Sequence, residues 1–158
     1  GKESAVLTQY LMSLSDEQGG SDPRVADAIV GAYLWFERSA LRGYERRKAN
    51  SPWSDGGKSG ETDKVLVAAG AAAPPLWARF YAIEAYPTTT PIFCSRGCVD
   101  DPKLMRTAWP GGFAEISPER RNGYSWLGTW AEERVIEAFD AWSDTHAFEW
   151  EPAGSNTP

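Results

Sequence analysis

The sequence predicts a mainly helical single domain with a few short strands. Three segments repeat apolar residues at helical spacing, two near the amino terminus and one near the carboxyl terminus. Between them lie short apolar runs bounded by proline and glycine, which is the pattern of short strands. The 158 residues, 42% of them hydrophobic, suffice for one core without metal or several disulfides. We therefore expect one domain over residues 1–150 and a linker-like tail at 151–158, which contains Pro, Gly, Ser and Asn.

Two helices are expected to begin the domain. Glu3–Leu14 predicts a helix that ends at the run Asp-Glu-Gln-Gly-Gly-Ser. Ser21 is a suitable N-cap for the second helix, which has Pro23 in its first turn and an expected stop at Gly43. The residues expected to face the core are Val6, Leu7, Tyr10, Leu11 and Leu14 in the first helix and Val25, Ile29, Ala32, Tyr33 and Phe36 in the second.

The middle of the chain is expected to combine a long loop with short strands. Lys48–Thr62 holds Pro, Ser, Asp and several glycines, which predicts a mobile surface loop. Trp53 in this loop has no evident core partner, so it either clamps a ligand or folds back on the domain. Strands are predicted at Lys64–Val67, Leu76–Ile83 and Ile92–Cys94.

Two further helices are expected to close the domain. Pro118–Tyr124 follows the helix-starting pair Ser117-Pro118, and Glu132–Ser143 carries an apolar stripe. The stripe residues expected to face inward are Val135, Ile136, Phe139 and Trp142.

The pair Arg120-Arg121 lies in the first turns of the helix that begins at Pro118. Consecutive residues on a helix point in different directions, so both guanidinium groups cannot reach one spot. We expect one arginine to face a ligand and the other to pair with Glu119 or Glu115.

Charge and composition exclude some partners and favour others. A net charge of −6 argues against a nucleic acid or an anionic membrane, which need a broad basic surface. No apolar run approaches the roughly 20 residues needed to span a bilayer. Eight tryptophans and six tyrosines suit either a Trp-rich core or a carbohydrate binder, whose rings contact the apolar faces of sugars.

The two cysteines, Cys94 and Cys98, flank Arg96 in the run Cys-Ser-Arg-Gly-Cys. An even pair in a short polar loop indicates a small disulfide in an exported protein, although two reduced thiols remain the alternative. Zinc is improbable, because this spacing lacks further cysteines and His146 is the only histidine. The nearby acidic run Val99–Asp101 is a weak calcium candidate, since neighbouring loop carboxylates are usually solvated.

The stretch Leu76–Ile83 suggests a ligand class. If it is extended, Trp77, Arg79 and Tyr81 share one face and Phe80 takes the other. Guanidinium pairs with carboxylate through two hydrogen bonds, and a ring offers an apolar face to a sugar. A carboxylate on a pyranose is a uronic acid. The alternative is that Arg79 bridges to a local glutamate and the aromatic residues are core.

Several motifs resemble the family 10 pectate lyases. They are Trp77–Tyr81, the following Pro-Ile-Phe-Cys, Arg96-Gly97, and Glu115-Ile116 with the run ERRNGYSW at 119–126. The resemblance implies that Arg79 and Arg96 bind uronate carboxylates. It also implies a fold: a partial helical toroid related to the lyase (α/α) barrel, with short strands along the ligand edge. The residues then expected to contact ligand are Arg79, Arg96, Tyr81, Trp77, Arg121 and Tyr124.

The chain also departs from the lyase pattern. Ala82 stands at the family's aspartate after the RFY motif, Trp126-Leu127-Gly128 replaces a WYG-like end, and insertions occur near Tyr86–Thr90 and Ala49–Glu61. The family's calcium-binding aspartates and catalytic arginine precede the segment that resembles residues 1–14. Beta-elimination needs a base and an electrophile, and no matching residues supply them.

These features predict a non-catalytic module that binds pectate, the polygalacturonate of plant cell walls, and needs no cofactor. We expect the module to be secreted, tethered to catalytic domains in a larger polypeptide, and bound to an acidic polysaccharide rather than to nucleic acid or membrane. Alternatives are a minimal calcium-dependent pectate lyase and a protein-interaction domain whose arginines only hold the fold.

Overall fold

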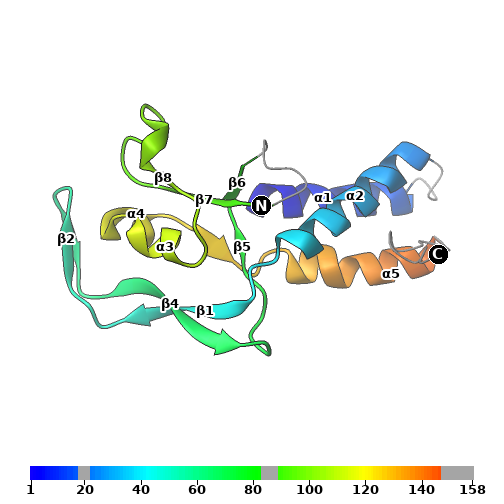
Figure 1. Cartoon of the computed structure of the whole chain (residues 1–158). Helices are drawn as coiled ribbons and strands as arrows, with labels where there is room; N and C mark the ends of the chain where they lie inside the picture. Colours follow the sequence, from blue (N-terminus) through cyan, green and yellow to red (C-terminus); the bar gives the residue numbers. More distant parts are fainter. Residues whose placement is uncertain (18–21, 83–88, 147–158) are drawn as a thin grey trace, which may run out of the picture.

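A computed structural model describes residues 1–17, 22–82 and 89–146 (Figure 1). At one end lie three helices side by side: α1 (Lys2–Glu17), α2 (Pro23–Ser39) and α5 (Ala138–Thr145). A π-helical segment, η2 (Glu132–Glu137), leads into α5 and packs against both other helices. None of the helices in this described part is long and apolar enough to cross a membrane.

The other end is built from short antiparallel sheets (Figure 1). The longest pairs β1 (Gly43–Ala49) with β4 (Asp63–Gly70), and a hairpin of β2 (Trp53–Asp55) and β3 (Lys58–Gly60) extends beyond it. The other strands are β5 (Trp77–Ala78) paired with β9 (Leu127–Gly128), and β6 (Phe80–Tyr81), β7 (Pro91–Cys94) and β8 (Met105–Arg106) in one sheet. Short helices η1 (Pro102–Leu104), α3 (Gly111–Glu115) and α4 (Pro118–Gly123) cover them.

The expectation of a mainly α fold, a partial helical toroid, is wrong. The described residues form an α+β arrangement in which helices and small sheets occupy opposite ends (Figure 1). The largest error concerns Lys48–Thr62, which forms strands instead of a loop. Gly56 and Gly57 adopt φ +56° and +78°, so they make the two-residue turn that matches the twist of a hairpin. This hairpin coincides with the insertion at Ala49–Glu61.

The predicted inward face of α1 is also wrong. Val6, Leu7 and Tyr10 are 45%, 58% and 58% exposed, whereas small and polar residues are buried. The buried residues are Ala5, Thr8, Met12 and Ser15. Small side chains let a helix approach its neighbours closely, and Ala5 packs into the cluster formed by Phe36, Trp77 and Val135.

Helix α2 confirms its predicted core stripe, with Ile29 and Phe36 fully buried. Its N-cap is Asp22, whose side chain accepts a hydrogen bond from the Arg24 N–H at 2.9 Å. Ser21, the predicted cap, lies outside the described residues. The helix ends at Ser39 because Ala40 is extended, so Gly43 begins β1 instead of ending the helix.

The remaining predicted elements are confirmed with small changes. α4 matches Pro118–Tyr124, β7 matches Ile92–Cys94, and η2 with α5 matches Glu132–Ser143. Val135, Phe139 and Trp142 are buried as predicted. The tail at 151–158 and Ile83 lie outside the described residues.

Candidate functional site

The strand predicted at Leu76–Ile83 breaks at Arg79. β5 pairs with β9, whereas β6 pairs with β7, so Trp77 and Tyr81 belong to different sheets. Trp77 is fully buried, and its indole N–H donates to the Phe36 carbonyl at 2.8 Å. Trp77 is therefore a core residue with no surface for a ligand.

Tyr81 is occupied by the fold. Its hydroxyl donates to the Ser39 carbonyl at 3.0 Å and accepts from the Ala78 N–H at 2.8 Å. Burial, only partly opposed by these hydrogen bonds, raises the pKa of Tyr81 to about 12. The ring packs edge-on against Trp35, with centroids 5.0 Å apart. These contacts indicate that Tyr81 ties α2 to the strands.

Arg79 lies at the surface among aromatic residues. Its Cζ is 4.7 Å from the centroid of Tyr124 and 5.9 Å from that of Phe80, and its side chain is 24% exposed. One guanidinium nitrogen, Nη2, donates to the carboxylate of Glu3 on α1. A cation over a ring gains about 0.5–1 kcal/mol at exposed sites, which fixes the guanidinium plane.

Tyr124 is the centre of this aromatic surface. Its ring stacks on Phe80 at 6.3 Å between centroids and lies 5.6 Å from Cζ of Arg120. Phe80 is 43% exposed, so one apolar ring face remains open to solvent beside Arg79. Arg120 in turn donates from Nε to the Cys94 carbonyl at 3.3 Å, which connects α4 to the cysteine loop.

The predicted Cys94–Cys98 disulfide is present, with the two Cα atoms 5.6 Å apart. Arg96 projects from this loop and its side chain is 62% exposed. Arg96 Nη2 lies 3.4 Å from Glu119 Oε2, and Lys58 Nζ from the β2–β3 hairpin lies 2.8 Å from Glu119 Oε1. Glu119 is thus a buried carboxylate shared by two exposed cations.

These side chains form what we call the cationic band. Its members are Arg79, Arg120, Arg96 and Lys58. Within the band the carboxylate of Glu3 pairs with Arg79, and that of Glu119 pairs with Lys58 and Arg96. Four positive charges against two negative charges leave a surplus that an acidic ligand can neutralise, although the whole chain carries −6.

Arg121, in contrast, is neutralised inside the protein. It forms a bidentate ion pair with Asp63 on β4, and the two side chains are 12% and 9% exposed. Its Nη1 also donates to the carbonyls of Ala114 and Ile116 at 2.7 and 2.6 Å. The geometry gives Arg121 a structural role, in place of the predicted ligand contact.

Both carboxylates of the band are held as anions. The hydrogen bond from Lys58, helped by Arg96 and opposed by burial, lowers the pKa of Glu119 below its ordinary value. At Glu3, burial raises the pKa, but hydrogen bonds from its own backbone N–H and from Arg79 outweigh that effect and the net shift is downward. A carboxylate with a lowered pKa is a weak general base at neutral pH.

The calcium candidate at Val99–Asp101 lies on the far side of the disulfide loop. Asp101 accepts a hydrogen bond from the Lys103 N–H at 3.0 Å and so caps η1. Within residues 1–17, 22–82 and 89–146, no group of three or more His, Cys, Asp or Glu side chains could hold a metal ion.

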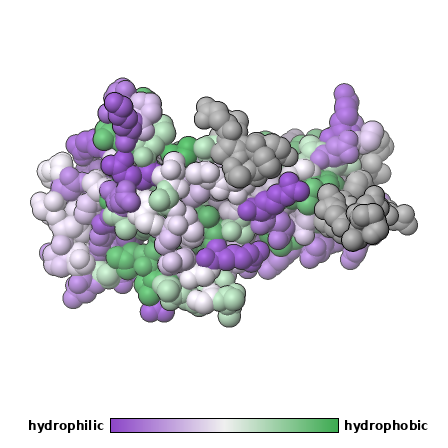
Figure 2. Space-filling model, in the orientation of Figure 1, coloured by the Kyte–Doolittle hydropathy of each residue, from purple (hydrophilic) through white to green (hydrophobic). Residues whose placement is uncertain are grey.

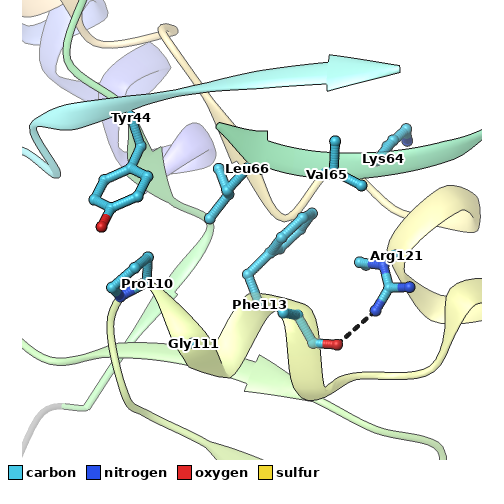
Figure 3. A pocket seen from close by; sticks show the side chains of 9 residues that line it. Tyr44, Lys64, Val65, Leu66, Pro110, Gly111, Phe113 and Arg121 are labelled. Carbon is cyan, nitrogen blue, oxygen red and sulfur yellow. Dashed lines mark hydrogen bonds between the residues drawn. The ribbon is translucent and has the colours of Figure 1, made fainter. Parts of the chain in front are cut away.

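A separate cavity of about 360 Å³ lies between β4 and α3 (Figure 3). Val65, Leu66 and Phe113 line it, and Figure 2 shows apolar atoms gathered over this part of β4. Its two cations are engaged elsewhere: Lys64 Nζ donates to the Asn122 carbonyl at 2.9 Å, and Arg121 pairs with Asp63. The cavity is an apolar recess and differs in chemistry from the cationic band.

Comparison with known proteins gives one positive result. The family model described as pectic acid lyase matches residues 1–136, which include every member of the cationic band. The chain belongs to the pectic acid lyase family. No curated protein and no solved structure gives a significant match. Membership of the pectic acid lyase family supports a pectate-related function and an acidic polysaccharide as the molecule recognised.

Sequence reasoning missed part of this site. Lys58 lay in a presumed loop, Phe80 was assigned to the opposite face from Arg79, and Glu3 is 76 residues away from its partner in the chain. The run ERRNGYSW did point to Arg120 and Tyr124, but helical spacing could not tell which arginine faces solvent.

Proposed function

We propose that this domain binds pectate through the cationic band without cleaving it. The observation that carries the proposal is the Arg79 guanidinium 4.7 Å from the Tyr124 ring centroid, beside the half-exposed ring of Phe80. A galacturonate residue offers one carboxylate and an apolar C–H face. The guanidinium fork matches the carboxylate and an open ring matches the sugar face.

The Glu3 side chain supports a carboxylate site at Arg79. It is 61% exposed and places a carboxylate against Nη2 of Arg79. An exposed ion pair contributes only about 0–1 kcal/mol, so a uronate carboxylate can take the place of Glu3 at small cost. The pairing shows which chemical group this position accepts.

The proposal that the domain does not cleave its ligand rests on the state of the carboxylates. Glu3 and Glu119 both have lowered pKa values and both are ion-paired, so neither is suited to remove the proton alpha to a uronate carboxylate. The family description favours one second candidate, a minimal calcium-dependent lyase.

Charge is the expected basis of ligand choice. Unesterified polygalacturonate should retard the protein strongly in affinity electrophoresis, methyl-esterified pectin less, and neutral glucans not at all. Raising the salt concentration should weaken the retardation, because exposed charges are screened over about 8 Å at physiological ionic strength. Equal retardation by cellulose or mannan would indicate ring stacking without carboxylate recognition.

Absence of cleavage is a second expected result. Incubation with polygalacturonate and calcium should give no rise in the ultraviolet absorbance of unsaturated products, because no suitably basic carboxylate stands in the band. A calcium-dependent rise that is lost in the Arg79→Ala variant would establish the minimal lyase instead.

We also infer that the domain acts outside the cell and directs an attached enzyme to the plant cell wall. The Cys94–Cys98 disulfide supports export, because such bonds persist in oxidising compartments. The open reading frame that encodes the protein tests this proposal, since a signal peptide and a neighbouring hydrolase, esterase or lyase domain are expected there.

A further inference from the structure

We propose that Lys58 and Arg96 form a second carboxylate subsite of the pectate site, and that the β2–β3 hairpin builds it. The inference rests on the proposed function and adds to it a residue outside the motifs that carry the family resemblance. It concerns polymeric uronate, because two separate positive clusters suit two uronate residues of one chain.

The first argument is the geometry around Glu119. Its carboxylate is 10% exposed and holds Lys58 Nζ at 2.8 Å and Arg96 Nη2 at 3.4 Å. The side chains of the two cations are 66% and 62% exposed. Glu119 therefore fixes the cations from below, and their other N–H groups remain open to solvent.

The second argument is charge. Lys58 and Arg96 share the single carboxylate of Glu119, which leaves this cluster with one unbalanced positive charge. Arg79 and Arg120 lie over the same Tyr124 ring, and the carboxylate of Glu3 pairs with Arg79, which leaves the same surplus. Each cluster can therefore accept one uronate carboxylate.

The third argument is the packing of the hairpin turn on Arg96. A Cβ at Gly56 would stand 2.5 Å from Arg96 Nη2 and 2.9 Å from its Cζ. A Cβ at neighbouring Gly57 would meet no atom within 4 Å. The guanidinium thus rests directly on the bare backbone of Gly56, so the hairpin sets its position.

The two glycines provide a matched pair of variants. Both have positive φ, a region that asparagine tolerates better than other residues with a side chain. Gly56→Asn should displace the Arg96 guanidinium and lower the affinity for polygalacturonate about tenfold, as removal of a charge-assisted contact does. Gly57→Asn should bind as the unmodified protein does.

Lys58→Gln tests the cation itself. Glutamine keeps a hydrogen-bond donor for Glu119 and removes the positive charge, so we expect a threefold to tenfold weaker affinity, on the order expected for one partly exposed ionic contact. The dependence of affinity on salt should also become shallower, which loss of a structural contact would not cause. Arg24→Ala, which removes one charge from the opposite end of the molecule, should change neither quantity.

Calorimetric titration with polygalacturonate, with circular dichroism as the folding control, gives the decision. Unchanged affinity in folded Lys58→Gln and Gly56→Asn variants, together with weaker binding by Arg79→Ala, would overturn the second subsite and leave the proposed function intact. Failure of the unmodified protein to bind polygalacturonate would overturn both. A loss in Gly57→Asn equal to that in Gly56→Asn would also overturn the subsite, because it would trace the effect to the turn and not to Arg96.

Discussion

Replacing Arg121 with alanine is expected to lower the free energy of unfolding by about 3–5 kcal/mol, the usual cost of breaking a buried ion pair from one side. Arg121 and Asp63 are 12% and 9% exposed, so the variant would leave a carboxylate in a site that water scarcely reaches. The carbonyls of Ala114 and Ile116 would lose their donor as well. Chemical denaturation measures the change.

A matched control is Arg42→Ala. Arg42 pairs with Glu37 at 3.6 Å, with the side chains 57% and 38% exposed, and its removal should cost less than about 1 kcal/mol. A similarly small loss in Arg121→Ala would contradict the structural role of Arg121. Unchanged stability with weaker pectate binding would return Arg121 to the ligand contacts predicted from sequence.

The same ion pair implies a pH dependence. Burial raises the pKa of Asp63, but hydrogen bonds from Arg121 and Asn122 outweigh it and the net shift is downward. A pKa that is lower in the folded than in the unfolded state stabilises the fold at high pH. The stabilisation should be full above the unfolded value of about 3.9 and should fade as pH falls through the folded value. The difference in stability between the unmodified protein and Asp63→Asn should therefore shrink below about pH 4.

Local patterns in the sequence predicted the elements whose signals are local. The stripe of α2, the Ser-Pro start of α4 and the cysteine spacing each depend on residues close together in the chain. The hairpin was predicted as a loop because its Asp-Gly-Gly turn was taken as loop composition and not as a turn with two positive φ residues.

Long-range contacts explain the remaining errors. Arg121 faces the interior because Asp63 meets it from 58 residues away, which no helical spacing reveals. The inward face of α1 was misassigned because the apolar stripe lies at the surface while Ala5 makes the close contact. Trp77 and Tyr81 were assigned to one face with Arg79, but the backbone changes sheets at that residue.

Replacing Arg79 with alanine is expected to weaken binding of polygalacturonate by roughly tenfold or more, since hydrogen bonds to charged groups contribute about 1.5–3 kcal/mol. The fold should persist, because the partner that is left behind, Glu3, is 61% exposed and remains hydrated. Arg96→Ala should have a comparable effect for the same reason, since its side chain is 62% exposed. Arg79→Lys should recover only part of the loss, because an ammonium lacks the planar fork.

Two controls separate this prediction from a general effect of charge. Arg24→Ala lowers the net charge by the same amount at the other end of the molecule and should bind as the unmodified protein does. The melting temperature of Arg79→Ala should stay close to that of the unmodified protein, since only an exposed ion pair is lost.

The most direct test of pectate binding at the cationic band is calorimetric titration of polygalacturonate into the Arg79→Ala, Arg96→Ala double variant. Circular dichroism first establishes that the variant is folded. We expect no measurable heat of binding under conditions in which the unmodified protein binds, because each carboxylate subsite has lost its guanidinium. Full affinity in the folded double variant would contradict the assignment of the ligand site to these residues.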